Sequence, residues 1–144
     1  MIRLAILGSP CLAGDPAARG AVVTTITGWV SQARPGCLEI VTGGDPSVGE
    51  MAERVALHLE LPLSIFRPDP RELARAKNAK QAWPAYRVRN EQLLGRITHL
   101  VCIRCPVASP GDWWTEREAR RLRRIVLPPI DITCARHGGQ PTGR

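Results

Sequence analysis

The fold expected for this chain follows from the stretch Leu38-Glu39-Ile40-Val41-Thr42-Gly43-Gly44-Asp45-Pro46-Ser47-Val48-Gly49-Glu50. An apolar run typical of a buried strand turns through two glycines into a segment whose apolar residues recur at helical spacing. At such a junction, the free backbone N–H groups of the first helical turn lie at the positive end of the helix dipole, where phosphate or another anion can bind. The stretch therefore predicts a strand, an anion-binding turn and a helix.

The same alternation of strand and helix continues along the chain. We expect strands at residues 2–7, 37–42, 62–66 and 99–103, with a fifth at 125–127 or 130–133. The helices are expected at residues 16–32 and 47–59, from residue 70 toward 80 with a break at Trp83-Pro84, and then at residues 87–95 and 115–124. This order predicts an α/β, Rossmann-like three-layer sandwich with a central, mostly parallel sheet of about five strands and ligands at the carboxyl ends of the strands.

Length and composition indicate one ordinary globular domain. The chain has 144 residues, of which 44% are hydrophobic and 23% charged, so it can bury a core without metals or disulfides. We place that domain at residues 1–133 and expect residues 134–144 to be a flexible tail, because they are rich in glycine and polar residues. No segment approaches the roughly 18 apolar residues of a membrane span. The amino terminus is typical of a buried strand and not of a signal peptide, so a cytoplasmic protein without a membrane partner is expected.

The net charge of +7 comes almost wholly from arginine, since Lys77 and Lys80 are the only lysines. Arginine binds phosphate in a planar, bidentate manner, which favours a nucleotide or nucleic-acid partner; solvated surface arginines would explain the charge equally well. Single-stranded nucleic acid could stack on the few aromatic residues near these arginines, or those residues could pack in the core or in a contact between copies. They are Trp83, Tyr86, Trp113 and Trp114.

Five cysteines without an export signal are expected to be reduced. Cys102, Cys105, Cys134 and His137 have the ligand types and pair spacings of a structural zinc site. Cys102, however, lies within the apolar run of residues 100–103, where a cysteine behaves as a small hydrophobic residue. The sequence therefore favours no metal and no bound cofactor.

The glycine-rich junction differs from two common phosphate-binding motifs. It lacks the Gly-Lys-Ser/Thr of a P-loop, and it follows the second predicted strand instead of the first, unlike a dinucleotide-binding fingerprint. Ser47 and Glu50 also have capping-box spacing, so Glu50 could simply bond back to the Ser47 amide. The residues alone leave a ligand role and a structural role open for Glu50 and for both glycines.

Several short motifs follow one another in a particular order along the chain. They are Gly8-Ser9 after the first predicted strand, Thr42-Gly43-Gly44 and Gly49-Glu50 at the end of the second, Arg67-Pro68-Asp69 after the third, and Arg89-Asn90 on the helix expected at residues 87–95. This order resembles the SLOG superfamily, in particular the branch related to the YpsA and YspA proteins, over roughly residues 2–127. Relatives of that branch include the LOG phosphoribohydrolases and the DNA-processing protein DprA.

The resemblance implies a Rossmann-like pocket for a nucleotide or a nucleotide-derived ligand. By matching position, Gly8 and Ser9 would lie in the pocket wall, and Gly43 and Gly44 would lie beside phosphate. Glu50, which follows Gly49, would stand at the family's acidic position. Arg89 and Asn90 match the family's Arg-Asn pair, and Thr115 matches the threonine that opens the last helix on the phosphate side. Relatives commonly form homo-oligomers, which this chain is also expected to do.

The chain departs from these relatives in three places. Pro10 replaces a frequent arginine, Glu50 replaces the usual aspartate, and Trp114 replaces the glycine before Thr115. The Pro-Gly-Gly-x-Gly-Thr-x-x-Glu signature of the LOG enzymes is absent. Ligand binding is therefore the function expected first. Cleavage of an N-glycosidic bond with Glu50 as the catalytic carboxylate, and single-stranded nucleic-acid binding, remain as alternatives.

Overall fold

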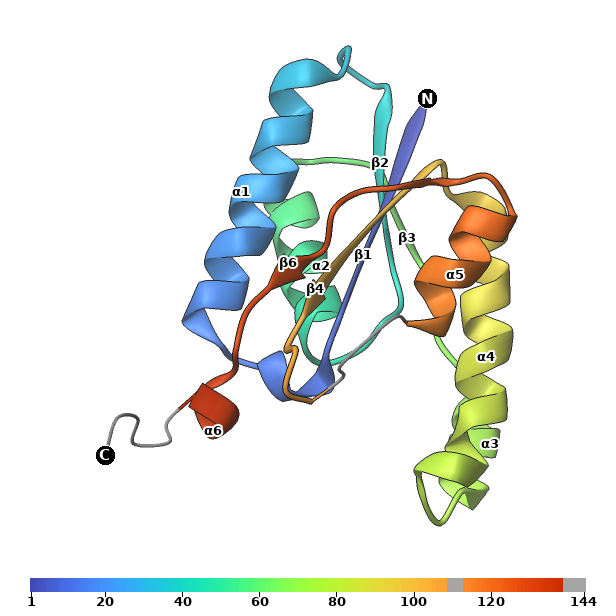
Figure 1. The fold of residues 1–144 in the computed structure, drawn as a ribbon. Coiled ribbons are helices and arrows are strands. Elements are labelled where there is room, and N and C mark those ends of the chain that lie inside the picture. Colours follow the sequence, from blue (N-terminus) through green and yellow to red (C-terminus); the bar gives the residue numbers. More distant parts are fainter. Residues whose placement is uncertain (109–112, 139–144) are drawn as a thin grey trace.

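A computed structural model of the chain describes residues 1–108 and 113–138. Its centre is a six-stranded sheet in the order β3-β2-β1-β4-β5, with β6 also paired to β4. Every strand pair is parallel. The strands are β1 (Ile2–Gly8), β2 (Leu38–Thr42), β3 (Leu63–Ile65), β4 (His99–Arg104), β5 (Ile125–Val126) and β6 (Ile130–Asp131). The expected fold class is confirmed: the protein is an α/β, Rossmann-like three-layer sandwich (Figure 1).

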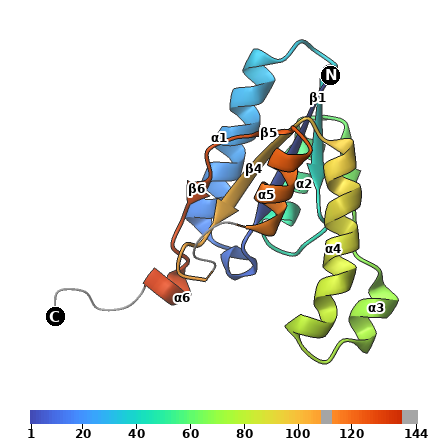
Figure 2. The same ribbon diagram turned by 45° about the vertical axis from the view of Figure 1, so that its right-hand side comes forward.

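Helices cover both faces of the sheet (Figures 1 and 2). On one face, α1 (Pro16–Gln32) and α2 (Val48–His58) bury residues such as Leu4, Ile6 and Ile103. On the other, α4 (Ala79–Arg96) and α5 (Trp114–Arg121) pack over Ala5, Leu7 and Leu100. The two cores follow from the alternation of side chains along β1 and β4. In the part of the chain described, no helix combines the length and the apolar character needed to cross a membrane.

Side-chain caps begin several of these helices where the sequence predicts them. Asp15 Oδ1 accepts a hydrogen bond from the Ala18 amide at 3.0 Å, and proline occupies the first position of α1. Asp69 Oδ1 accepts one from the Arg71 amide at 2.8 Å and starts α3 (Pro70–Arg75), which packs against α4. Each cap satisfies a backbone donor that the helix itself leaves unpaired.

The expected break at Trp83-Pro84 is wrong, because α4 runs through both residues without interruption. Asn78 starts this helix by accepting a hydrogen bond from the Gln81 amide at 2.9 Å. Pro84 removes one intrahelical donor. The burial of Leu93 and Leu94 farther along holds the helix against the sheet. Tertiary packing thus prevails over the local preference of proline, and α3 ends at Arg75 instead of continuing toward Lys80.

Both candidates for the last strand are present, one after the other along β4. His99 and Leu100 pair with β5, whereas Ile103 and Arg104 pair with β6. Pro128 and Pro129 separate the two segments. Proline has no N–H to donate to the sheet, so the edge strand is interrupted there.

The chain continues to pack beyond the expected domain boundary at residue 133. Cys134 is 1% exposed and belongs to the core, and α6 (Ala135–Gly138) follows it directly. The Ile132 amide donates to the Arg104 carbonyl at 2.8 Å and extends the pairing of β6 with β4. The packed domain therefore reaches at least Gly138, and the rest of the expected tail, residues 139–144, lies outside the described residues.

Candidate functional site

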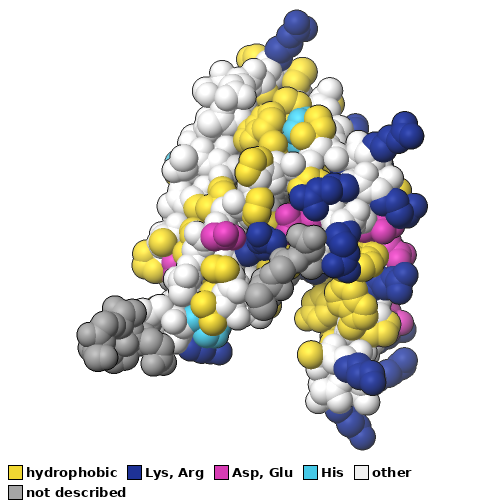
Figure 3. Space-filling model, viewed as in Figure 1, with side chains coloured by type: hydrophobic (Ala, Val, Ile, Leu, Met, Phe, Trp, Pro, Cys, Tyr) yellow, Lys and Arg dark blue, Asp and Glu magenta, His cyan; other side chains and the backbone are white. Residues whose placement is uncertain are grey.

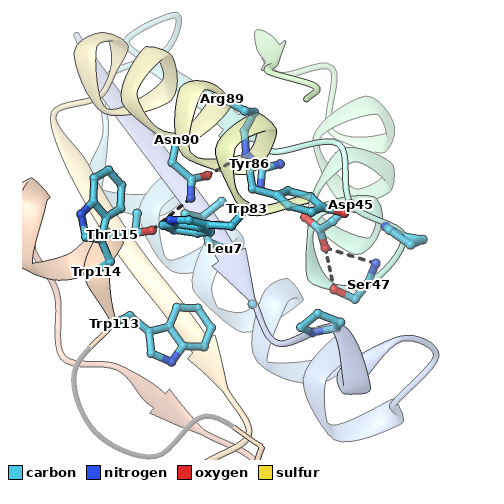
Figure 4. Close-up of a pocket in the computed structure, with 13 residues that line it drawn as sticks. Leu7, Asp45, Ser47, Trp83, Tyr86, Arg89, Asn90, Trp113, Trp114 and Thr115 are labelled. Carbon is cyan, nitrogen blue, oxygen red and sulfur yellow. Dashed lines mark hydrogen bonds between the residues drawn. The ribbon is translucent and has the colours of Figure 1, made fainter. Parts of the chain in front are cut away.

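A cavity of about 560 Å³ lies at the carboxyl end of β1, between the loop after β2, helix α4 and the start of α5. Pockets of 300–1,000 Å³ commonly hold small ligands. Figure 4 shows side chains from these separate segments around one space. The lining consists of Leu7, Gly8, Pro10, Asp45, Pro46, Ser47, Trp83, Tyr86, Arg89, Asn90, Trp113, Trp114 and Thr115.

Three buried polar side chains form a connected hydrogen-bond chain in the wall of this pocket (Figure 4). Arg89 Nε donates to Asn90 Oδ1 at 2.7 Å, and Asn90 Nδ2 donates to Thr115 Oγ1 at 3.3 Å. Arg89 Nη1 donates to the carbonyl oxygen of Gly43. The chain joins the loop after β2, helix α4 and the first turn of α5, so the polar wall is held by three elements at once.

Arg89 is a buried cation in the lining of this cavity. It is 9% exposed, and burial lowers the pKa of its guanidinium, although the negative charge of Asp45 acts in the opposite direction. Its guanidinium carbon lies 5.5 Å from the centre of the Tyr86 ring. Among the described residues, Arg89 makes no ion pair within 4.0 Å, and its Nη2 donates no hydrogen bond. An anionic or carbonyl oxygen of a ligand would satisfy that donor.

The N-terminus of α2, where the sequence predicts anion binding, already faces an acidic side chain of this protein. Asp45 Oδ2 accepts hydrogen bonds from the amides of Ser47 and Gly49 at 3.2 and 3.1 Å, and from Ser47 Oγ at 2.5 Å. The carboxylate therefore occupies the position that a phosphate would take at this helix. The capping box between Ser47 and Glu50 is not formed, because Ser47 makes no side-chain cap and Asp45 takes that role.

Close packing explains both glycines of the junction. A Cβ atom on Gly43 would lie 2.4 Å from Arg89 Nη1. Gly44 has a φ of +69°, and a Cβ there would lie 2.6 Å from Arg67 Cγ. Glycine is needed at both positions to let these arginines approach the backbone. Neither glycine lines the 560 Å³ cavity.

Four of the residues expected from the sequence come together in the cavity: Gly8, Arg89, Asn90 and Thr115. Glu50 lies outside it. Glu50 lines a separate hollow of about 300 Å³ and pairs with Arg54 at 2.6 Å. Gly49 is buried in the first turn of α2 against the Asp45 carboxylate.

Ser9 also lies outside the cavity and has a structural contact. It is fully buried, and its Oγ accepts a hydrogen bond from the Cys105 amide at 2.9 Å. The Ser9 amide in turn donates to the Ile103 carbonyl at 3.2 Å. Ser9 thus joins the end of β1 to the end of β4.

The aromatic side chains provide most of the apolar lining, and sequence reasoning did not assign them to this pocket. Trp83 and Trp114 contact each other edge to face, with ring centres 5.7 Å apart, and Arg87 lies 5.7 Å from the Trp114 ring centre. Trp83 remains 40% exposed. Figure 3 shows hydrophobic side chains gathered beside α4, with Lys and Arg side chains around them. Their concentration at residues 83–86 and 113–114, in a chain with 4% aromatic residues, is the signal that could have indicated this site.

The structure changes one member of the zinc-ligand set that the sequence analysis considered, Cys102, Cys105, Cys134 and His137. Cys102 is 1% exposed and packs with Leu7 and Leu100, on the sheet face opposite Cys105. Alternation along the strand causes this separation. Cys11, from the short helix η1 (Pro10–Leu12), takes its place beside Cys105, Cys134 and His137.

Comparison with models of protein families gives no match, and no curated protein matches this sequence significantly.

Proposed function

We propose that this protein binds a nucleotide or nucleotide-derived ligand at the carboxyl ends of the strands. The site is the cavity lined by Trp83, Tyr86, Trp113 and Trp114, called the aromatic pocket from here on. The observation that carries the proposal is the pairing of a tryptophan-rich wall with the buried guanidinium of Arg89 in one cavity of about 560 Å³. A planar base suits the indole rings, and an anionic group suits the arginine. Doubly wound sheets commonly bind ligands at this edge.

The polar wall supports a ligand with both hydrogen-bonding and charged groups. Arg89 Nη2 is free to donate among the described residues, and the Thr115 hydroxyl, which accepts from Asn90, still has its own proton to donate. Both donors belong to buried side chains held by neighbouring contacts. Donors fixed in this way lose little entropy when a ligand binds.

Binding without turnover is the form of this proposal that the geometry favours. Hydrolysis at an anomeric carbon needs a carboxylate within reach of the ligand. Glu50 lines a different hollow and pairs with Arg54, while Asp45, the carboxylate in the cavity lining, caps α2. We therefore expect Glu50→Gln to leave ligand affinity unchanged.

Thermal unfolding with AMP, GMP and ADP-ribose tests the proposal. A ligand present at about 100 times its Kd stabilises the native state by about 2.7 kcal/mol, which raises the melting temperature by several degrees. Trp83→Ala should weaken the shift by removing a partly exposed ring without emptying the core. Arg89→Ala should abolish it, with folding of this variant checked by circular dichroism.

Two matched variants serve as controls. Trp29→Phe alters a tryptophan that packs against His99 and against the core between the sheet and helices α1 and α2. Arg121→Ala removes an arginine that pairs with Glu118 on α5. Both should keep the full ligand shift. The proposal fails if no compound stabilises the wild type, or if both controls lose the shift as Trp83→Ala does. Salt-sensitive retardation of a single-stranded oligonucleotide without any nucleotide shift would instead favour nucleic-acid binding.

A further inference from the structure

A cluster of sulfur and nitrogen atoms lies outside the aromatic pocket. It consists of Cys11, Cys105, Cys134 and His137, whose ligand atoms all lie within 4.8 Å of one another. Cys105 and Cys134 are buried, whereas Cys11 and His137 are partly exposed. Figures 1 and 2 show η1, the end of β4 and α6 at the same end of the sheet. Three segments far apart in the sequence thus bring four metal-binding side chains together.

The distances suit one tetrahedral metal ion. His137 Nδ1 lies 3.4 Å from Cys105 Sγ and 2.9 Å from Cys134 Sγ. With metal–sulfur bonds of about 2.3 Å and metal–nitrogen bonds of about 2.0–2.1 Å, tetrahedral ligands lie roughly 3.5–3.8 Å apart. Adjustments of about 1 Å would therefore let all four atoms surround one ion.

Hydrogen bonds hold together the segments that carry the four ligands. Ser9 Oγ accepts from the Cys105 amide at 2.9 Å, which fixes Cys105 relative to the β1–η1 turn that carries Cys11. The amide of His137 donates to the Cys134 carbonyl at 3.0 Å, so these two ligands lie on one helical turn. The pairing of Arg104 with Asp131 brings the segment with Cys134 beside the end of β4. The arrangement is thus built by the fold and not by chance contact of exposed side chains.

The surroundings of Cys105 also suit a metal ligand. Backbone N–H groups of Cys134, Ala108 and Val107 donate hydrogen bonds to its side chain. Hydrogen bonds of this kind orient a ligand and support its charge. Three thiols gathered within 4.8 Å would repel one another as thiolates, and a divalent cation would remove that repulsion.

We propose that Cys11, Cys105, Cys134 and His137 bind one structural Zn²⁺ ion. Thiolate and imidazole ligands in tetrahedral geometry favour zinc, and four protein ligands leave no open position for a reacting water. The ion fastens η1 and α6 to the end of β4. It also holds the β1–η1 turn, where Gly8 and Pro10 line the aromatic pocket. The site is separate from the proposed ligand pocket and does not depend on it.

Metal analysis of the whole chain, purified with a phosphine reductant and loaded with ZnCl2, tests the site. We expect one tightly bound zinc per chain after gel filtration. Cobalt substitution should give the intense visible absorption of tetrahedral thiolate coordination. Cys134→Ser and His137→Ala should each lower zinc retention at least tenfold. Because His137 lies in the last described helix, its variant is expected to keep the fold, as circular dichroism would show.

Cys37→Ser is the matched control, because Cys37 lies in the turn before β2 and outside the cluster. It should retain zinc like the wild type. The proposal is overturned if the reduced protein retains no zinc, or if His137→Ala and Cys134→Ser retain as much as Cys37→Ser. A disulfide among Cys11, Cys105 and Cys134 in protein purified without reductant, together with failure to bind zinc after reduction, would also overturn it.

Discussion

Arg89 Nη1 donates a hydrogen bond to the carbonyl oxygen of Gly43, and this contact joins the middle of α4 to the loop after β2. The two residues lie 46 positions apart in the chain. Their contact brings the glycine-rich junction and the candidate ligand site together, although the glycines themselves do not line the cavity. The junction acts on the pocket by positioning Arg89.

Gly43→Ala should destabilise the protein by roughly 1–3 kcal/mol, the usual cost of forcing an atom into a packed site. The added Cβ would lie 2.4 Å from Arg89 Nη1 and displace the guanidinium. Urea unfolding measures the change. Gly20→Ala in α1 is the control, since its added Cβ would meet no described atom within 4 Å beyond its chain neighbours and its own helix backbone. It should gain roughly 0.5–1 kcal/mol from helix propensity, and equal losses in both variants would contradict this explanation.

Asp45→Ala should cost about 1 kcal/mol, the typical value for loss of an N-terminal helix cap. Its carboxylate accepts from the Ser47 and Gly49 amides, which would then lose their acceptor. Denaturant unfolding tests this change as well. Glu50→Ala removes a nearby carboxylate that forms an exposed pair with Arg54, and it should cost less than about 0.5 kcal/mol. If Glu50→Ala costs more than Asp45→Ala, Asp45 is not the cap that stabilises α2.

Glu116→Ala should destabilise the protein by about 3 kcal/mol, because it breaks a buried ion pair with Arg104. Arg104 Nη1 lies 3.0 Å from Glu116 Oε1, and their side chains are 15% and 4% exposed. The Arg87–Glu91 pair on α4 provides an exposed comparison. Glu91→Ala should change the unfolding free energy by at most about 0.5 kcal/mol. Similar losses in both variants would show that burial does not set the strength of these pairs.

Protonation of His99 should lower stability in mild acid. Burial lowers the pKa of His99, whose ring lies 5.0 Å from that of Trp29. The native state therefore binds fewer protons than the unfolded state, so the free energy of unfolding falls as the pH drops below about 6.5. His99→Asn should reduce that slope, as urea unfolding at several pH values can measure. An unchanged slope in His99→Asn would refute the assignment.

The strand and helix pattern could be predicted because it depends on local order. Apolar runs gave β1, β2 and β4, and Asp15 and Asp69 marked helix starts that the structure confirms as caps. The continuous α4 could not be predicted in this way. Its path through Pro84 depends on the packing of residues farther along the helix. The local sequence at Trp83-Pro84 carries no information about that packing.

The candidate site was only partly predictable, for a related reason. Gly8, Arg89, Asn90 and Thr115 were expected together and line one cavity. Their aromatic neighbours come from α4 and the start of α5, so a sequence window does not show that they face one another. The cysteine cluster illustrates the same point: Cys11 lies more than ninety residues before Cys105, and only the pairing of β1 with β4 brings them together.

Pro128 and Pro129 have a consequence beyond the sheet edge that they interrupt. A continuous row of unpaired backbone groups at an edge would allow another chain to add a strand. Here β5 and β6 are short segments separated by a stretch with two prolines, which have no N–H donors, and β3 at the opposite edge spans three residues. Growth of the sheet across two molecules is disfavoured at both ends. Any assembly of this chain should therefore join molecules through helices and loops, which leaves the sheet a closed unit within each copy.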